Sequence, residues 1–138
     1  MFNEKLALDY LKRAGHRLKA LETLMAEESW ADVVREAQEL VELTLRALLR
    51  SGGVDVPRVH DLSPVLQENA ERLPGGTRGR LGELVGISRA LRRDRELAFY
   101  GSEDLTPSDF YTRDDAALAL ASARLVHSEV SKALAQTP

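Results

Sequence analysis

The stretch that most constrains the fold is a periodic apolar segment, residues 30–51, that ends at two glycines. Its apolar stripe consists of Val34, Ala37, Val41, Thr44 and Leu48, widened by Val33, Leu40, Leu45 and Leu49. These three- and four-residue steps predict a helix that is buried along much of its length. Ser29 is expected to cap the first turn, with Asp32 at capping-box spacing. Ser51-Gly52-Gly53 is expected to end the helix, because glycine tolerates the left-handed conformation.

The rest of the chain predicts helices on both sides of this segment. We expect them at 3–27, 64–72, 77–98 and from 113 onward, and no stretch is typical of a strand. Pro64 fits the first turn of the short helix, and Thr112 with Asp115 has capping-box spacing. The predicted fold is all-α: one domain over residues 1–138, an up-and-down bundle of four long helices plus a short one.

Composition limits the function classes. The 138 residues contain no cysteine and carry a formal charge of −3, so disulfides and thiolate metal sites are excluded and a cytoplasmic protein is expected. We find no apolar run near roughly 18 residues and no leader, so neither a membrane span nor export is expected. His16, His60 and His127 have no second ligand at helical spacing, so neither a metal nor a cofactor is expected.

Residues 72–95 depart from the acidic average. They contain seven arginines against two acids, a local balance of +5: Arg72, Arg78, Arg80, Arg89, Arg92, Arg93 and Arg95. Arginine suits phosphate because its planar fork donates to two oxygens. The alternative is that these arginines pair with glutamates of the first two helices. Arg95 continues the apolar stripe of its helix, so its charge needs a partner or a water-filled cleft.

The second helix has a charged side as well. Glu39, Glu42, Arg46 and Arg50 are expected on its outer face, and Glu42 with Arg46 has the favourable four-residue spacing. This spacing explains these residues without a function.

An ordered set of residues resembles the HEPN domain, a small helical domain named for nucleotide binding. The set comprises Ala37-Gln38, Val41-Glu42, the run Leu45 to Leu49, Gly53, Pro57, His60-Asp61-Leu62, the run Arg95 to Gly101, Pro107, Tyr111 and Asp115-Ala116. The resemblance covers most of the chain. It implies a helical bundle with a nucleotide- or RNA-related role, often encoded beside or fused to a minimal nucleotidyltransferase.

Catalytic members of that family are metal-independent ribonucleases. Their motif is an arginine, a polar residue and, four to six residues after the arginine, a histidine that is often followed by tyrosine. Arginine stabilises the phosphorane charge and histidine moves the proton of the 2′-hydroxyl. This chain has Arg93, Asp94 and Tyr100, but Ala98 stands where the histidine belongs. The motif is therefore absent as written.

The residues that remain indicate an anion-binding site. Arg93 and Arg95 can hold phosphates, Tyr100 can stack on a base, and Asp94 can orient an arginine or accept from a ribose. His60 either enters the same cleft or caps the next helix locally. The alternative is structural: Arg95 and Asp94 form an ion-pair network with Glu39 or Glu42, and Tyr100 packs on the end of the bundle.

Three functional hypotheses follow. The first is a non-enzymatic homodimer that binds a nucleotide or RNA, with a nucleotidyltransferase partner implied by the resemblance. The second is a divergent ribonuclease, the toxin of a toxin-antitoxin pair, using Arg93 with His60 or Tyr100. The third is a structural dimerisation bundle. Gly82 and Gly86, four residues apart, leave a flat strip that lets a second subunit approach closely.

Overall fold

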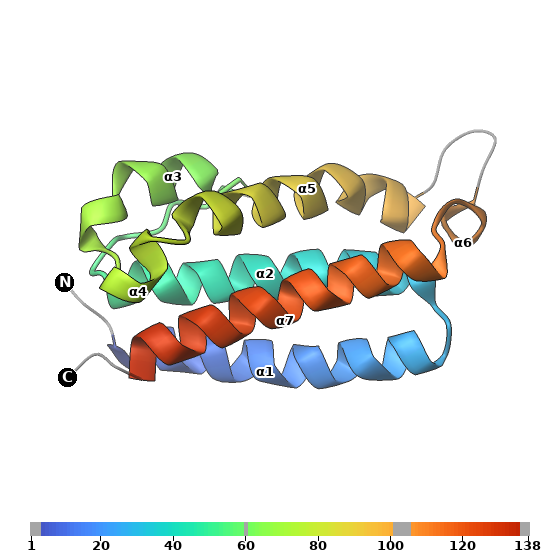
Figure 1. The fold of residues 1–138 in the computed structure, drawn as a ribbon, viewed down its shortest axis with the longest axis horizontal. Helices are drawn as coiled ribbons and strands as arrows, with labels where there is room; N and C mark the ends of the chain where they lie inside the picture. The colour runs from blue at the N-terminus through green and yellow to red at the C-terminus, as the bar shows by residue number, and fades with distance from the viewer. Residues whose placement is uncertain (1–3, 60, 101–105, 136–138) are drawn as a thin grey trace.

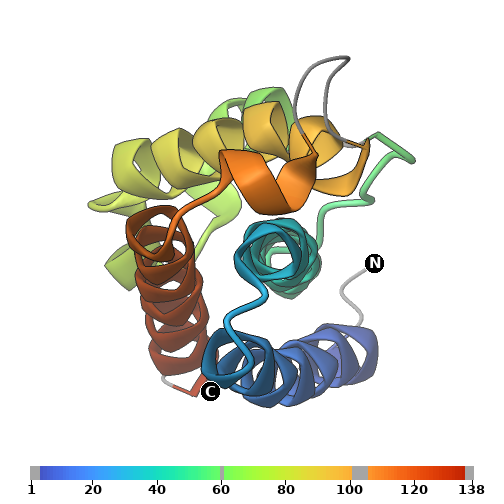
Figure 2. The ribbon, with the colours of Figure 1, turned by 90° about the vertical axis from the view of Figure 1, so that its right-hand side faces the viewer.

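Helix α2 (Trp30–Ser51) lies at the centre of the structure, with the other long helices packed around it (Figure 2). These are α1 (Glu4–Ala26), α5 (Leu81–Tyr100) and α7 (Arg113–Ala135) (Figure 1). The computed structural model describes residues 4–59, 61–100 and 106–135, with only the backbone for 93–100. Twelve of the 22 residues of α2 are buried, which confirms the predicted stripe.

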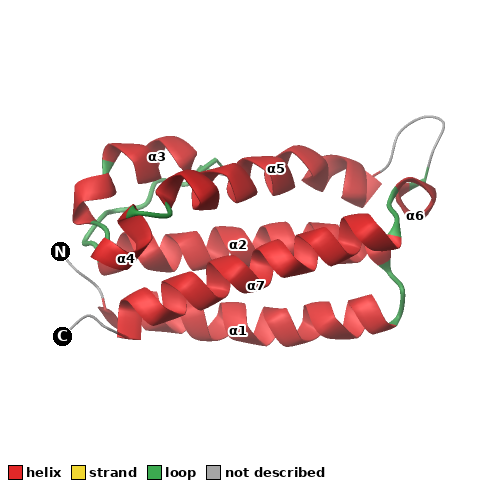
Figure 3. Cartoon of the chain, in the orientation of Figure 1, coloured by secondary structure: helices red, strands yellow, loops and turns green. Residues whose placement is uncertain are grey.

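Short helices join the long ones. They are α3 (Ser63–Glu68), the 3-10 turn η1 (Ala70–Arg72), α4 (Gly75–Arg78) and α6 (Pro107–Phe110). Figure 3 shows helices joined by loops, and the residues that the structure describes include no strand. The predicted all-α bundle with four long helices is confirmed. Instead of one short helix, however, several short turns connect the long ones.

Two predicted helices were too long. The helix expected at 64–72 ends at Glu68, where Asn69 donates to the Val65 carbonyl from its side-chain amide at 2.8 Å and from its backbone amide at 3.2 Å. The helix expected at 77–98 begins only at Leu81. Three glycines within residues 75–79 weaken any helix there by about 1 kcal/mol each. The chain therefore forms the separate turn α4.

The two predicted caps had different outcomes. At the start of α7, the Thr112 amide donates to Asp115 Oδ2 at 2.9 Å and the Asp115 amide donates to Thr112 Oγ1 at 3.3 Å, which confirms the capping box. At the start of α2 the prediction was wrong. The Ser29 hydroxyl donates to the Asp32 carboxylate at 2.7 Å and accepts no amide hydrogen bond. The carboxylate is the stronger partner for that hydroxyl.

The end of α2 depends on its two glycines for different reasons. Gly53 has a φ of 76°, which confirms the predicted left-handed stop. Gly52 instead allows a close approach: a Cβ added there would lie 2.6 Å from the backbone carbonyl oxygen of Arg72. The η1 turn is thereby packed directly against the end of α2.

We expect Gly52→Ala to lower the free energy of unfolding by about 1–3 kcal/mol, because the new methyl group meets backbone that cannot rotate away. Gly76→Ala is the matched control, since a Cβ at Gly76 meets nothing within 4 Å. Urea unfolding of both variants gives the comparison. Equal stabilities would show that η1 moves freely relative to α2.

Candidate functional site

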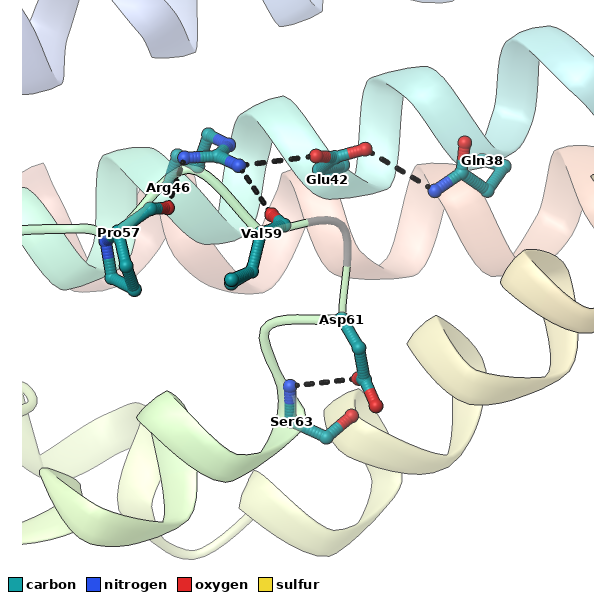
Figure 4. A network of polar contacts seen from close by, with 7 residues as sticks. All are labelled: Gln38, Glu42, Arg46, Pro57, Val59, Asp61 and Ser63. Carbon is teal, nitrogen blue, oxygen red and sulfur yellow. Dashed lines mark hydrogen bonds and ion pairs between the residues drawn. The ribbon is translucent and has the colours of Figure 1, made fainter.

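The loop between α2 and α3 is tied to α2 through Arg46. Its guanidinium donates to the carbonyls of Pro57 at 3.3 Å and Val59 at 2.6 Å, and it pairs with Glu42 at 3.2 Å (Figure 4). Gln38 donates to the same carboxylate at 3.3 Å. The side chains of Arg46 and Glu42 are only 21% and 13% exposed. The predicted pair is confirmed, but its outer-face position was wrong because the loop covers it.

Asp61 holds the other end of this loop. The Ser63 amide donates to Asp61 Oδ1 at 3.1 Å (Figure 4). Burial opposes ionisation of the carboxylate. The amide hydrogen bond, the nearby Ser63 hydroxyl and the positive charges of Arg92 and Arg89 together outweigh that effect, so the pKa of Asp61 lies below its ordinary value of 3.8. Asp61 is therefore a charged group that faces α5.

Four of the seven arginines in residues 72–95 divide into two groups. Arg78 donates to the carbonyls of Leu73 and Glu71, at 2.8 and 2.9 Å. Arg80 pairs with Glu83 at 2.8 Å and with Glu129 of α7 at 2.6 Å, so these two arginines hold the fold together. Their partners are not the glutamates of α1 and α2 considered in the sequence analysis.

The second group is exposed. Arg89 and Arg92 lie on the surface of α5, and neither has a carboxylate within 4 Å among the residues that the structure describes. Both act on Asp61 through their charge. Positions 89 and 92 are three residues apart and so share one side of the helix. Two guanidinium groups thus stand beside one ionised carboxylate at the start of α3.

The residues selected from the sequence continue along the same helix. The backbone of Arg93, Asp94, Arg95 and Tyr100 lies in the C-terminal half of α5, but their side chains lie outside the described part of the structure. His60 also lies outside the described residues. Its two neighbours in sequence are fixed, Val59 through its carbonyl and Asp61 through its carboxylate.

Gly82 and Gly86 lie on an open side of α5. A Cβ added at either glycine meets nothing within 4 Å. Gly86 lines a hollow of about 350 Å³ between α5 and α7, together with Ile87, Ala90 and Leu118. Leu118 is 70% exposed. The hollow and this protruding leucine lie on one face of the molecule, and apolar side chains form much of the wall.

Sequence reasoning missed the grouping of Arg89 and Arg92 with Asp61. Each residue was visible, as a member of the basic stretch or of the His60-Asp61-Leu62 set. Only the packing of α3 beside α5 brings them together. The one signal in the sequence was the three-residue spacing of the two arginines, which places them on one side of the helix.

A family model for the HEPN domain matches residues 7–133. The chain belongs to the HEPN family. The match spans nearly the whole HEPN bundle, from α1 to the last turn of α7, and confirms the resemblance found in the sequence. Neither a curated protein nor a solved structure matches the sequence.

Two further observations concern this HEPN chain. Within the described ranges, no three His, Cys, Asp or Glu side chains are grouped so that they could hold a metal ion. In the same ranges, every helix is too short or too polar to cross a membrane.

Asp61→Asn tests the electrostatic role of Asp61, because it removes the charge and keeps an oxygen that can accept from the Ser63 amide. With its folded pKa lowered, Asp61 contributes stability above its unfolded pKa, and that contribution is lost as pH falls through the folded pKa. We expect the variant to be less stable than wild type at about pH 7, and by a smaller margin at about pH 3.

Urea unfolding at both pH values measures this difference. The exposed Asp9→Asn is the matched control and is expected to change stability by less than about 0.5 kcal/mol at either pH. A deficit of Asp61→Asn that persists unchanged in acid would contradict the electrostatic role of Asp61.

Proposed function

We propose that this HEPN protein is a nucleotide- or RNA-binding module that holds phosphate groups between α5 and the start of α3. One observation carries the proposal: Arg89 and Arg92 are exposed, have no close carboxylate among the described residues, and stand beside ionised Asp61. An arginine fork can donate to two phosphate oxygens. The charge of Asp61 attracts both guanidinium groups, but neither guanidinium forms an ion pair with the Asp61 carboxylate within 4 Å.

The same site extends toward the C-terminus of α5. Arg93 and Arg95 follow Arg92 in the chain, and Tyr100 lies about 12 Å beyond Arg92 along the helix axis. In our proposal Arg93 and Arg95 bind further phosphates, Asp94 orients them, and Tyr100 stacks on a base. His60 joins from the loop beside Asp61. Because no histidine follows these arginines at the family spacing, we propose binding without cleavage.

RNA retention tests the site. We expect purified protein to retain labelled total RNA, with affinity that falls as salt rises. The double variant Arg89→Ala/Arg92→Ala should weaken retention at least tenfold and reduce the slope of log affinity against log salt by about 0.7 for each phosphate that is no longer bound. The matched control Arg124→Ala removes an exposed arginine of α7 that pairs with Glu22 and should bind like wild type.

The same assay, run in chelator, separates binding from catalysis. Cleavage products that disappear in Arg93→Ala would replace our proposal with a metal-independent ribonuclease. RNA binding that is equal in wild type and the double variant would remove Arg89 and Arg92 from the site. No retention at all would leave a structural or partner-binding bundle.

We further propose that the protein is a homodimer joined through the α5–α7 face around Gly82 and Gly86. The support is that this face carries both an apolar hollow and a protruding Leu118. A two-fold axis brings identical surfaces together, so each Leu118 can enter the hollow of the other copy. Burying one leucine side chain contributes about 1.5–3 kcal/mol. The bare backbone at Gly82 and Gly86 permits close approach.

Gly86→Trp fills that hollow from within. We expect this variant, and also Leu118→Lys, to sediment as monomers with unchanged helix content, whereas the control Gly76→Ala sediments as wild type. A Gly86→Trp variant that still dimerises would place the interface elsewhere.

We also propose a minimal nucleotidyltransferase as the protein partner, as the HEPN resemblance implies. Co-expression with such an enzyme, followed by affinity purification, gives the test. Absence of a complex at micromolar concentrations would count against this partner.

A further inference from the structure

A second hollow lies between α1 and α2, on the other side of the loop that carries Asp61. Its volume is about 430 Å³, and it is lined by Tyr10, Arg13, Leu43, Arg46, Arg58 and Val59. Three of these six residues are arginines, contributed by α1, α2 and the loop. None was singled out as a binding residue from the sequence, because the two exposed arginines lie 45 positions apart.

The three arginines are not equivalent. Arg46 pairs with Glu42 and donates to the carbonyls of Pro57 and Val59, so these contacts hold its side chain in place. Arg13 and Arg58 are exposed, and neither has a carboxylate within 4 Å among the described residues. The one neighbouring carboxylate of this network, Glu42, already faces Arg46 and Gln38. Two guanidinium groups therefore face one hollow with unused donors.

The remaining lining is apolar and aromatic. Tyr10 is half-buried and its hydroxyl makes no hydrogen bond within the described structure. Leu43 lies beside it, and Val59, 40% exposed, lies on the rim. A partly exposed aromatic ring with apolar neighbours is a stacking surface for a nucleobase of any sequence. Combined with the two exposed arginines, it matches both parts of a nucleotide: a flat base and an anionic phosphate.

The hollow is close to the proposed phosphate site. Val59 lines the hollow, and Asp61, two residues later, faces Arg89 and Arg92. The Cα atoms of Val59 and Asp61 are at most about 7 Å apart. Figure 4 shows the loop running from Val59, beside Arg46 of α2, to Asp61, beside the start of α3. One ligand strand that crosses this loop would therefore reach both positions.

We infer that the α1–α2 hollow binds one nucleotide of a single-stranded RNA, with its base on Tyr10 and its phosphate held by Arg13 and Arg58. The strand continues over the loop to Arg89 and Arg92. The path of the RNA strand in this inference rests on the proposed function. The hollow itself is lined by residues that are separate from the proposed phosphate site. A mononucleotide can therefore probe it alone.

The experiment titrates AMP, adenosine and inorganic phosphate into the full chain and measures binding by isothermal titration calorimetry, which reports on variants with and without Tyr10. AMP is expected to bind more tightly than adenosine or phosphate alone. Arg13→Ala/Arg58→Ala and Tyr10→Ala should each weaken AMP binding about tenfold or more, while Tyr10→Phe should retain it. The control Lys12→Ala removes a neighbouring charge of α1 that lines different hollows and should bind like wild type.

The arginines of α5 separate the two proposals. AMP binding that survives Arg89→Ala/Arg92→Ala and is abolished in Arg13→Ala/Arg58→Ala supports the inference. If AMP binding is unaffected by the Arg13 and Arg58 changes, the inference is overturned. It is also overturned if the protein binds RNA through Arg89 and Arg92 but does not bind AMP. In both of these cases the proposed function is judged by its own RNA assay. Thermal unfolding of each variant, including those at the half-buried Tyr10, checks that the fold is intact.

Discussion

The burial of α2 is the constraint on which the rest of the structure depends. Apolar side chains project from it in so many directions that no single neighbour can cover them. Helices α1, α5 and α7 cover three sides, and the loop after α2 covers the gap between α1 and α5 (Figure 2). That last side is less regular, and the loop is attached there both by Arg46 and by the packing of Val54, Val56 and Leu62 against the core. The proposed ligand sites lie on both sides of this loop.

The sequence predicted those elements whose cause is local. The long helices follow from apolar spacing, and the Thr112–Asp115 cap follows from two residues three positions apart. Predictions failed where a competing partner or weak propensity decided the outcome. The Ser29 hydroxyl had a carboxylate within reach, and the glycines at 75–79 interrupted an otherwise continuous pattern.

The candidate site was harder to predict because it depends on packing between distant segments. The basic stretch was visible, but only the fold distinguishes Arg78 and Arg80, which hold carbonyls and carboxylates, from Arg89 and Arg92, which remain exposed. Likewise, the sequence predicts that Arg46 faces solvent, and only the structure shows that the loop covers it. Spacing along one helix identifies its faces, but it does not identify which segment will pack there.

The close approach of Gly52 to the Arg72 carbonyl also restricts how this sequence can change during evolution. A larger residue at position 52 meets main chain, so no single side-chain replacement elsewhere relieves the contact. The connection between α2 and the η1 turn can therefore diverge only when both segments shift together. Related sequences with a bulkier residue at this point should carry an insertion or deletion near the η1 turn.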